Sequence, residues 1–166
     1  MILLSIDPGY ERLGIAVIEK EKKQKEVLLF SECFKTSSKL PHHKRLMLIG
    51  QKITEVVKKY KPKALATEKL FFSKNQKTAL FVAEARGVIL YTASLLGLEI
   101  HEYTPVSIKV AVTGYGKSEK TQVISMVSRL IDVPTKIKNG NGATKSDDEF
   151  DAIAIGLTHY ATHKQS

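Results

Sequence analysis

The first 35 residues contain three short apolar segments separated by turn signals, and this order most constrains the fold. The segments cover residues 2–6, 13–18 and 27–34, and the first ends directly at Asp7, followed by a Pro-Gly pair. Pro-Gly marks a turn, and the charged run 19–26 is typical of an exposed hairpin tip. Three consecutive strands joined by tight turns form an antiparallel meander. The chain is therefore expected to begin with a three-stranded antiparallel sheet.

After these strands the chain alternates between helical and strand patterns. Apolar residues recur at helical spacing over 46–60 and 78–96, and short apolar strands are expected at 64–67 and 98–103. Strands that alternate with helices are joined by parallel crossovers. We therefore expect an α/β fold with one mixed five-stranded sheet, antiparallel in its three leading strands and then parallel, flanked by helices.

Three further helices are expected in the last third of the chain. A short one begins at a Thr-Pro pair, with proline at the first helical position. Ser118 is expected to cap a helix over 119–131. Ser146 and Glu149, three residues apart, form a capping-box pair that begins a last helix over 147–163.

Length, charge and cysteine content exclude several classes of protein. The chain has 166 residues, with 26 Lys+Arg against 17 Asp+Glu and a net charge of +9. This length suits one domain, so residues 1–166 are expected to form a single domain. The lone Cys33 excludes a disulfide framework, no apolar run reaches the ~18–20 residues of a membrane span, and the N-terminus lacks signal-peptide features. We therefore expect a cytoplasmic protein without membrane contact, whose positive charge points to an anionic partner, most commonly nucleic acid.

Four of the 17 acids occupy positions that suit a metal site. Asp7 and Glu68 each end a buried strand, and Asp148 and Asp151 share one face at the start of the last helix. Each alone has an ordinary explanation as a turn acceptor, a strand end or an acidic first turn. Carboxylates that converge beyond the strand ends repel each other unless a cation compensates, and oxygen ligands select Mg²⁺ or Mn²⁺. Two such ions about 3.5–4 Å apart catalyse phosphodiester hydrolysis.

Ordered motifs spread over residues 2 to about 160 resemble those of one known family. They are Ile6-Asp7-Pro8-Gly9 with Gly14, Glu68 with Phe71, Lys74 and Asn75, Ala85-Arg86-Gly87, Lys109, Gly114 and Gly116, Glu119-Lys120, and Asp148-x-x-Asp151-Ala152-x-Ala154. In this order they are similar to the RuvC family of Holliday junction resolvases. The resemblance implies a ribonuclease H-like fold. It also implies a homodimeric endodeoxyribonuclease that resolves four-way DNA junctions by paired symmetric nicks, in DNA recombination and repair.

The same resemblance implies the catalytic carboxylates. By position, Asp7, Glu68, Asp148 and Asp151 match the family's metal-binding catalytic residues. They are expected to hold two Mg²⁺ ions per active site, with Mn²⁺ as a substitute. Asp147, next to Asp148, leaves the register of the third ligand open.

The resemblance also implies a DNA-binding set. Lys109 and Lys120 match basic residues that approach DNA, and they would hold phosphates near the metals. Lys117 is expected to contact the DNA backbone. Phe71 aligns with a wedge residue that stacks on or opens a base step, and we expect Phe71 rather than Phe72 to point outward.

The segment 78–96 is apolar on nearly all sides, with Glu84 and Arg86 as exceptions. Such a helix is either central to the core or a dimer surface. Arg86 either forms an ion pair, with Glu84 or a partner chain, or contacts DNA. The expected partners are four-way junction DNA, a second copy of the chain and a branch-migration motor. The remaining residues expected to be structural or exposed are Cys33, Tyr91, His42, His43, His159 and His163.

Two alternatives to the junction resolvase remain at this point. One is another nuclease of the ribonuclease H fold that acts on RNA or on RNA–DNA hybrid. The other is a DNA-junction binder without catalysis, which the presence of all four carboxylates disfavours. The aromatic loop after Glu68 and the pair Lys109 and Lys120 favour the junction resolvase over the first alternative.

Overall fold

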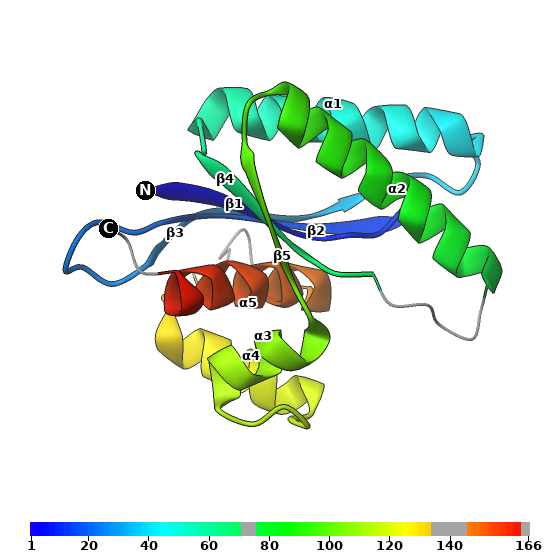
Figure 1. Cartoon of the computed structure of the whole chain (residues 1–166). Helices are drawn as coiled ribbons and strands as arrows, with labels where there is room; N and C mark the ends of the chain where they lie inside the picture. Colours follow the sequence, from blue (N-terminus) through cyan, green and yellow to red (C-terminus); the bar gives the residue numbers. More distant parts are fainter. Residues whose placement is uncertain (71–75, 134–145, 164–166) are drawn as a thin grey trace, which may run out of the picture.

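The computed structural model describes residues 1–70, 76–133 and 146–163 and forms a layered α/β structure (Figure 1). One sheet lies between two helical layers. The strands and helices, in chain order, are β1 (Ile2–Asp7), β2 (Arg12–Glu19), β3 (Val27–Lys35), α1 (His42–Tyr60), β4 (Ala64–Glu68), α2 (Gln76–Leu95), β5 (Glu99–Tyr103), α3 (Pro105–Thr113), α4 (Lys120–Leu130) and α5 (Asp147–Thr162).

The sheet has the order β3-β2-β1-β4-β5. The pairs β1–β2 and β2–β3 are antiparallel, whereas β1–β4 and β4–β5 are parallel. The expected mixed five-stranded sheet with an antiparallel leading half is thus confirmed. Because β1 and β4 are parallel neighbours, their C-terminal ends lie at the same edge of the sheet.

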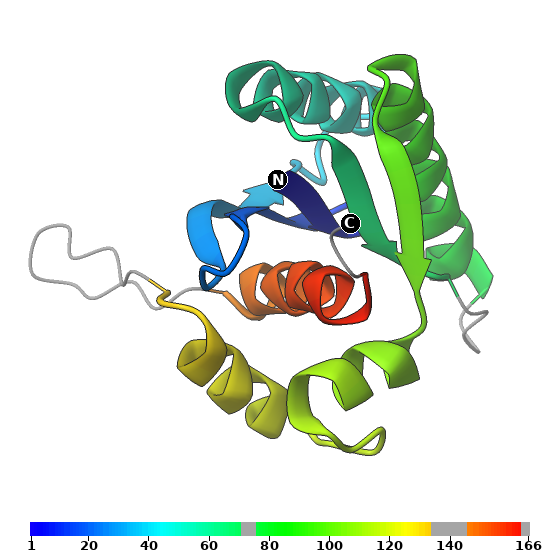
Figure 2. The same ribbon diagram turned by 60° about the vertical axis from the view of Figure 1, so that its left-hand side comes forward.

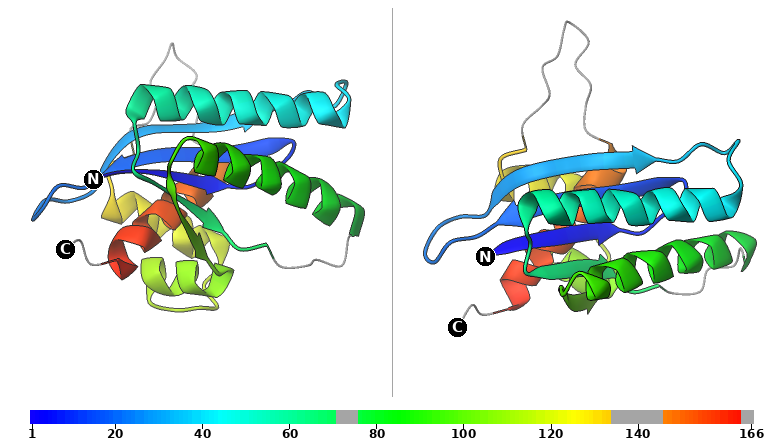
Figure 3. Two further views of the ribbon diagram at one scale, coloured as in Figure 1. Left: turned by 45° about the horizontal axis from the view of Figure 1, so that its top comes forward. Right: turned by 90° about the horizontal axis from the view of Figure 1, so that it is seen from above.

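Each face of the sheet has its own apolar core. Helices α1 and α2 lie together over one face, as the view from above shows (Figure 3), and α5 lies against the other. Helices α3 and α4 pack on α5 (Figure 2). Alternation along β1 supplies both cores, since Leu3 is buried on the α5 side and Leu4 on the α1 side. The central part of helix α5, from Ala152 to Tyr160, is buried, because the sheet and two helices enclose it.

Helix α2 buries only one stripe of its surface. Ala85, Ile89 and Ala93 recur every four residues and are fully buried against α1 and the sheet. Of the two alternatives expected for this helix, the place in the core holds for this stripe and for the partly buried Val88 and Leu90 beside it. Its large exposed apolar side chains are Leu80, Tyr91 and Leu95.

By length and composition alone, Thr78–Leu95 of α2 meets the criteria for a membrane-spanning helix, with a mean hydropathy of 1.2. The segment is not an uninterrupted apolar run, because Glu84 and Arg86 lie inside it. The two charges inside the segment are both paired: Glu84 with His42 of α1, at 2.6 Å, and Arg86 with Glu102 of β5. These ion pairs tie α2 to its neighbours in the fold.

One of the two helix caps predicted from the sequence is confirmed, and the other is wrong. Ser146 and Glu149 form the expected capping box at the start of α5. Ser118 does not cap α4, because Glu119 is the cap residue and forms a capping box with Gln122. The buried Ser118 hydroxyl instead donates to the Tyr115 carbonyl at 2.7 Å, which closes the turn between α3 and α4.

Candidate active site

A cleft of about 290 Å³ lies at the sheet edge where β1 and β4 end. Asp7 is the last residue of β1 and Glu68 the last of β4. Asp151, in the first turns of α5, also lines the cleft, together with Lys109 of α3 and Lys120 of α4. Three of the four carboxylates expected at the site therefore face one cavity, and two lysines complete its polar lining.

The carboxylates of the cleft disfavour one another's charge. Burial, together with the negative charges of Asp151, Glu68 and Asp148, raises the pKa of Asp7 to about 8. Burial and the charge of Asp151 also raise the pKa of Glu68, although Lys109 opposes the shift. Burial likewise raises the pKa of Asp151, despite a hydrogen bond from Lys120 Nζ at 3.0 Å. Such a set of oxygen donors fits a hard divalent cation, whose charge would offset the repulsion.

The fourth expected carboxylate, Asp148, lies beside the cleft and is held by a cation. Arg12 donates from Nε and Nη2 to Asp148 Oδ2, at 2.9 and 2.5 Å, and Cys33 Sγ lies 3.4 Å from the same oxygen. Burial tends to raise the pKa of Asp148, but the hydrogen bonds from Arg12 and Cys33 hold it below the usual value. The charge of Asp148 still reaches Asp7 and contributes to its raised pKa.

A glycine lets α5 approach the strand ends. Gly14 of β2 pairs with Asp7 in the sheet register. A Cβ atom at Gly14 would lie 2.1 Å from the Asp148 carbonyl oxygen and 3.1 Å from Asp7 Cβ. The missing side chain is therefore what allows the first turn of α5 to lie against β1 and β2.

Asp147 and the basic residues around the cleft occupy distinct positions. Asp147 lies outside the cleft and pairs with Lys120 at 3.4 Å. Lys117 is exposed in the turn between α3 and α4. Of the alternatives left open for Arg86, the structure shows an ion pair, and its partner is Glu102 rather than Glu84. Phe71 and Phe72 lie outside the described residues, so their expected roles are not placed by the structure.

Sequence reasoning missed two residues at this site. Arg12 and Cys33 both contact Asp148, although they are separated from it by 136 and 115 positions in the chain. Cys33 was expected to be structural or exposed, and Arg12 was not singled out. The signal that could have found Arg12 is its place opposite the end of β1, where the turn after Asp7 brings the start of β2 back beside the carboxylates.

Without a divalent metal, the contribution of Asp7 to the stability of the protein is expected to decrease as the pH rises. The pKa of Asp7 is about 8 in the folded protein against 3.8 for an ordinary aspartate in the unfolded chain, so this contribution to the free energy of unfolding should fall between about pH 4 and pH 8. Replacing Asp7 by Asn should remove this contribution. In a chelator, the melting temperature of Asp7→Asn relative to that of wild type should therefore rise across this pH range. The matched control is Asp132→Asn at an exposed carboxylate. A difference in melting temperature between wild type and Asp7→Asn that stays constant across this pH range would contradict the raised pKa of Asp7.

Comparison with known proteins identifies relatives over nearly the whole chain. The family described as crossover junction endodeoxyribonuclease RuvC matches residues 3–159. A protein of that name from Halothermothrix orenii is 43% identical over 159 residues, covering 96% of this chain and 92% of the relative. One from Alkaliphilus metalliredigens is 40% identical over 167 residues, covering 100% of this chain and 97% of the relative.

Solved structures agree with the sequence matches. The structure of T. thermophilus RuvC in complex with a Holliday junction substrate has a TM-score of 0.84 and 32% identity to this chain, covering 96% of this chain and 92% of that one. The yeast mitochondrial Holliday junction resolvase, with a TM-score of 0.67 and 14% identity, shares the fold. The expected ribonuclease H-like α/β fold is thereby confirmed. With the sequence order, the carboxylate cleft and these relatives in agreement, the chain belongs to the RuvC family of crossover junction endodeoxyribonucleases.

Proposed function

We propose that this chain resolves Holliday junctions: it is a Mg²⁺-dependent endodeoxyribonuclease that makes paired symmetric nicks in four-way DNA during recombination and repair. The observation that carries the proposal is the cleft at the edge of the sheet where Asp7, Glu68 and Asp151 converge. The chain that carries this acidic cleft has a net charge of +9. An acidic pocket on a basic protein suits a metal-assisted attack on a polyanion. The names of the relatives supply the junction as the substrate.

The carboxylates would hold two Mg²⁺ ions, for which Mn²⁺ can substitute. When bound, these ions activate a water for in-line attack on phosphorus and stabilise the leaving 3′ oxygen. The chain's own contribution is to fix the oxygens: Asp7 and Glu68 on rigid strand ends, and Asp151 on a helix buried beneath them. Breaking the bond from phosphorus to the 3′ oxygen leaves a 5′ phosphate and a 3′ hydroxyl, which can be ligated.

Asp148 is proposed as the fourth carboxylate ligand, and it would bind a metal through only one of its two oxygens. Both guanidinium hydrogen bonds from Arg12, and the Cys33 contact, go to Oδ2 of Asp148. Oδ1 is therefore the oxygen that Asp148 can offer to a metal while Arg12 orients the carboxylate. Asp147 does not line the cleft, and its carboxylate pairs with Lys120. This arrangement favours Asp148 as the third ligand.

Lys109 and Lys120 are proposed to bind the scissile phosphate, because both line the cleft and lie on separate helices beside the carboxylates. Lys117, exposed in the adjoining turn, would contact the backbone of the same strand. Phe71 is proposed as the wedge at the junction. Arg86, expected to bind DNA or to form an ion pair, is proposed to hold α2 against β5 through Glu102.

A homodimer would place two such clefts on one junction. Helix α2 offers a surface for it, since Leu80, Tyr91 and Leu95 are exposed on a helix whose opposite stripe is buried. Two related active sites would explain paired nicks in opposing strands. We propose that the chain works as a single domain over residues 1–166, in the cytoplasm, beside a branch-migration motor.

Substitution of Lys120 by Ala should weaken junction binding and lower its salt dependence. One lost phosphate contact reduces the slope of log affinity against log salt by about one unit. The matched control is Lys22→Ala, at the exposed β2–β3 hairpin at the opposite end of the sheet from Asp7. Fluorescence anisotropy at several salt concentrations measures both slopes. A slope equal to that of wild type would show that Lys120 makes no phosphate contact.

The substrate assignment is tested by matched cleavage assays. A four-way junction, a linear duplex and an RNA–DNA hybrid of the same sequence are incubated with the protein in Mg²⁺. The proposal predicts preferential cutting of the junction. Preferential cutting of the hybrid would favour another ribonuclease H-type nuclease, and junction binding without any nicking would favour a binder without catalysis.

A further inference from the structure

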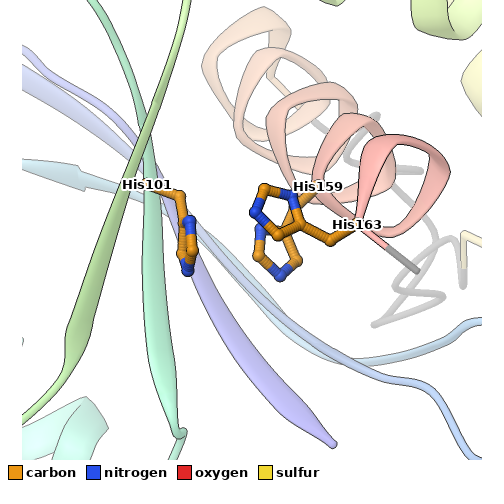
Figure 4. A group of neighbouring side chains, drawn as sticks. All are labelled: His101, His159 and His163. Atoms are coloured by element: carbon orange, nitrogen blue, oxygen red, sulfur yellow. The ribbon is translucent and has the colours of Figure 1, made fainter. Parts of the chain in front are cut away.

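Three histidines meet on the side of α5 that faces the edge strand β5 (Figure 4). His159 and His163 are four residues apart at the C-terminal end of α5, so they share one face of the helix. His101 comes from β5 and points toward them. One ring nitrogen from each of the three lies within 4.8 Å of the others.

This cluster is separate from the carboxylate cleft. His159 follows Asp151 by eight residues along α5, which corresponds to about 12 Å of helix. None of the three histidines lines the cleft. Among the residues that the structure describes, the cluster is a second place where side chains able to hold a metal gather, and its donors are nitrogens rather than oxygens.

Two of the three imidazoles, those of His159 and His101, are held in the neutral form that binds metals. Burial, with the neighbouring His101 and His163 rings, lowers the pKa of His159 to about 4. Burial also lowers the pKa of His101, although Glu99 opposes the shift. Metal coordination requires the neutral ring, so near pH 7 no proton has to be displaced from His159 or His101.

Tyr103 orients two of the rings. Its hydroxyl lies 2.9 Å from Nδ1 of His159 and 3.1 Å from Nδ1 of His163. A phenol has one proton to donate, but its oxygen can accept a hydrogen bond from each ring. When both rings donate their Nδ1–H to Tyr103, the Nε2 atom of each carries the lone pair. Such a hydrogen bond to the other ring nitrogen is the usual support for a metal-binding histidine.

We propose that His101, His159 and His163 form a binding site for a divalent transition metal of the Zn²⁺ type. Imidazole nitrogens prefer Zn²⁺ and similar ions over Mg²⁺, so this site and the carboxylate cleft select different metals. Glu99, whose Oε1 lies 3.1 Å from His101 Nε2, is placed to supply a fourth ligand. Tetrahedral Zn²⁺ needs its nitrogens about 3.3 Å apart, and the exposed His163 at the helix end is the ring that can close this gap.

A metal here would clamp the C-terminal end of α5 to the edge of the sheet. The opposite end of the same helix carries Asp148 and Asp151, and Glu68 ends β4, the neighbour of β5. The site would therefore stabilise α5, which carries Asp151, against the edge of the sheet next to β4, without contacting the substrate. Because the ion binds only the folded chain, it should raise the melting temperature.

Zinc binding by the full-length chain tests this inference. Equilibrium dialysis with Zn²⁺, in excess Mg²⁺, should give one tightly bound Zn²⁺ per chain, and the same stoichiometry in an Asp7→Asn variant. His163→Ala should weaken the affinity at least about tenfold, and Tyr103→Phe, which keeps the ring and loses the hydroxyl, should weaken it by a similar factor. The matched control is His43→Ala, an exposed histidine of α1, which should bind Zn²⁺ as wild type does.

A second readout separates binding at this site from general effects on folding. Zn²⁺ should raise the melting temperature of wild type and of His43→Ala, but not of His163→Ala. Bound Co²⁺ should show the visible spectrum of a tetrahedral site. Equal Zn²⁺ affinity in His163→Ala and His43→Ala, or Zn²⁺ binding that disappears with Asp7→Asn, would overturn the inference. Neither result bears on junction cleavage.

Discussion

Replacement of Asp7 by Asn is expected to lower junction cleavage by at least about 1,000-fold. Asp7 is the carboxylate whose pKa the cleft raises most clearly, so its ionisation depends most on the charge that a bound cation would supply. An amide keeps the size of the side chain but loses this charge. Junction binding should stay equal or tighten, because a negative charge that faces phosphates is removed.

Single-turnover cleavage and junction binding by fluorescence anisotropy measure the two effects separately. The control is Asp132→Asn, which removes one exposed carboxylate outside the cleft and should cut at the wild-type rate. Cleavage by Asp7→Asn at the wild-type rate would show that the catalytic site is misassigned. Loss of binding together with cleavage would show that Asp7 supports the DNA surface rather than the metal.

Replacement of Gly14 by Ala should reduce cleavage by about 100-fold through a shift of α5. The new Cβ would lie 2.1 Å from the Asp148 carbonyl oxygen, a contact that the backbone must relieve by moving. A displacement of about 1 Å in catalytic groups costs about 100-fold in rate. The same strain should cost about 1–3 kcal/mol of stability.

Gly87→Ala is the matched control for the stability measurement. Gly87 lies inside α2, and a Cβ there would meet no atom within 4 Å. Alanine should stabilise that helix by about 0.5–1 kcal/mol relative to glycine. Denaturant unfolding is measured on both variants, and cleavage is compared between Gly14→Ala and wild type. A Gly14→Ala variant as stable and as active as wild type would show that the close approach of α5 to β2 does not position the carboxylates.

The overall architecture could be predicted from the sequence because its signals are local. The Pro-Gly turn after Asp7, the charged hairpin 19–26 and the helical spacing over 46–60 each depend on residues close together in the chain. Asp7 and Glu68 could be placed because each directly follows a short apolar strand, which is also a local signal. Parallel neighbouring strands then bring their C-terminal ends to one edge of the sheet. The helix cap at Ser146 was predictable from a spacing of three residues.

What could not be predicted depends on contacts between distant segments. Arg12 holds Asp148 across 136 positions, a contact that depends on the packing of α5 against β2. Ser118 has the residue type of a helix cap, yet the turn between α3 and α4 draws its hydroxyl inward to Tyr115. His159 and His163 show metal-binding spacing, but His101 joins them only through the packing of α5 on β5.

Metal-dependent nicking of a four-way junction is the most direct test of the carboxylate cleft as a catalytic centre. Each strand of the junction is labelled in turn, and cleavage is followed in Mg²⁺, in a chelator, and after Mg²⁺ is restored. We predict paired symmetric nicks in two opposing strands with Mg²⁺, no cleavage in the chelator, and full recovery on restoration. Equal cleavage with and without the metal, or equal cleavage of a linear duplex, would contradict the assignment of Asp7, Glu68, Asp148 and Asp151.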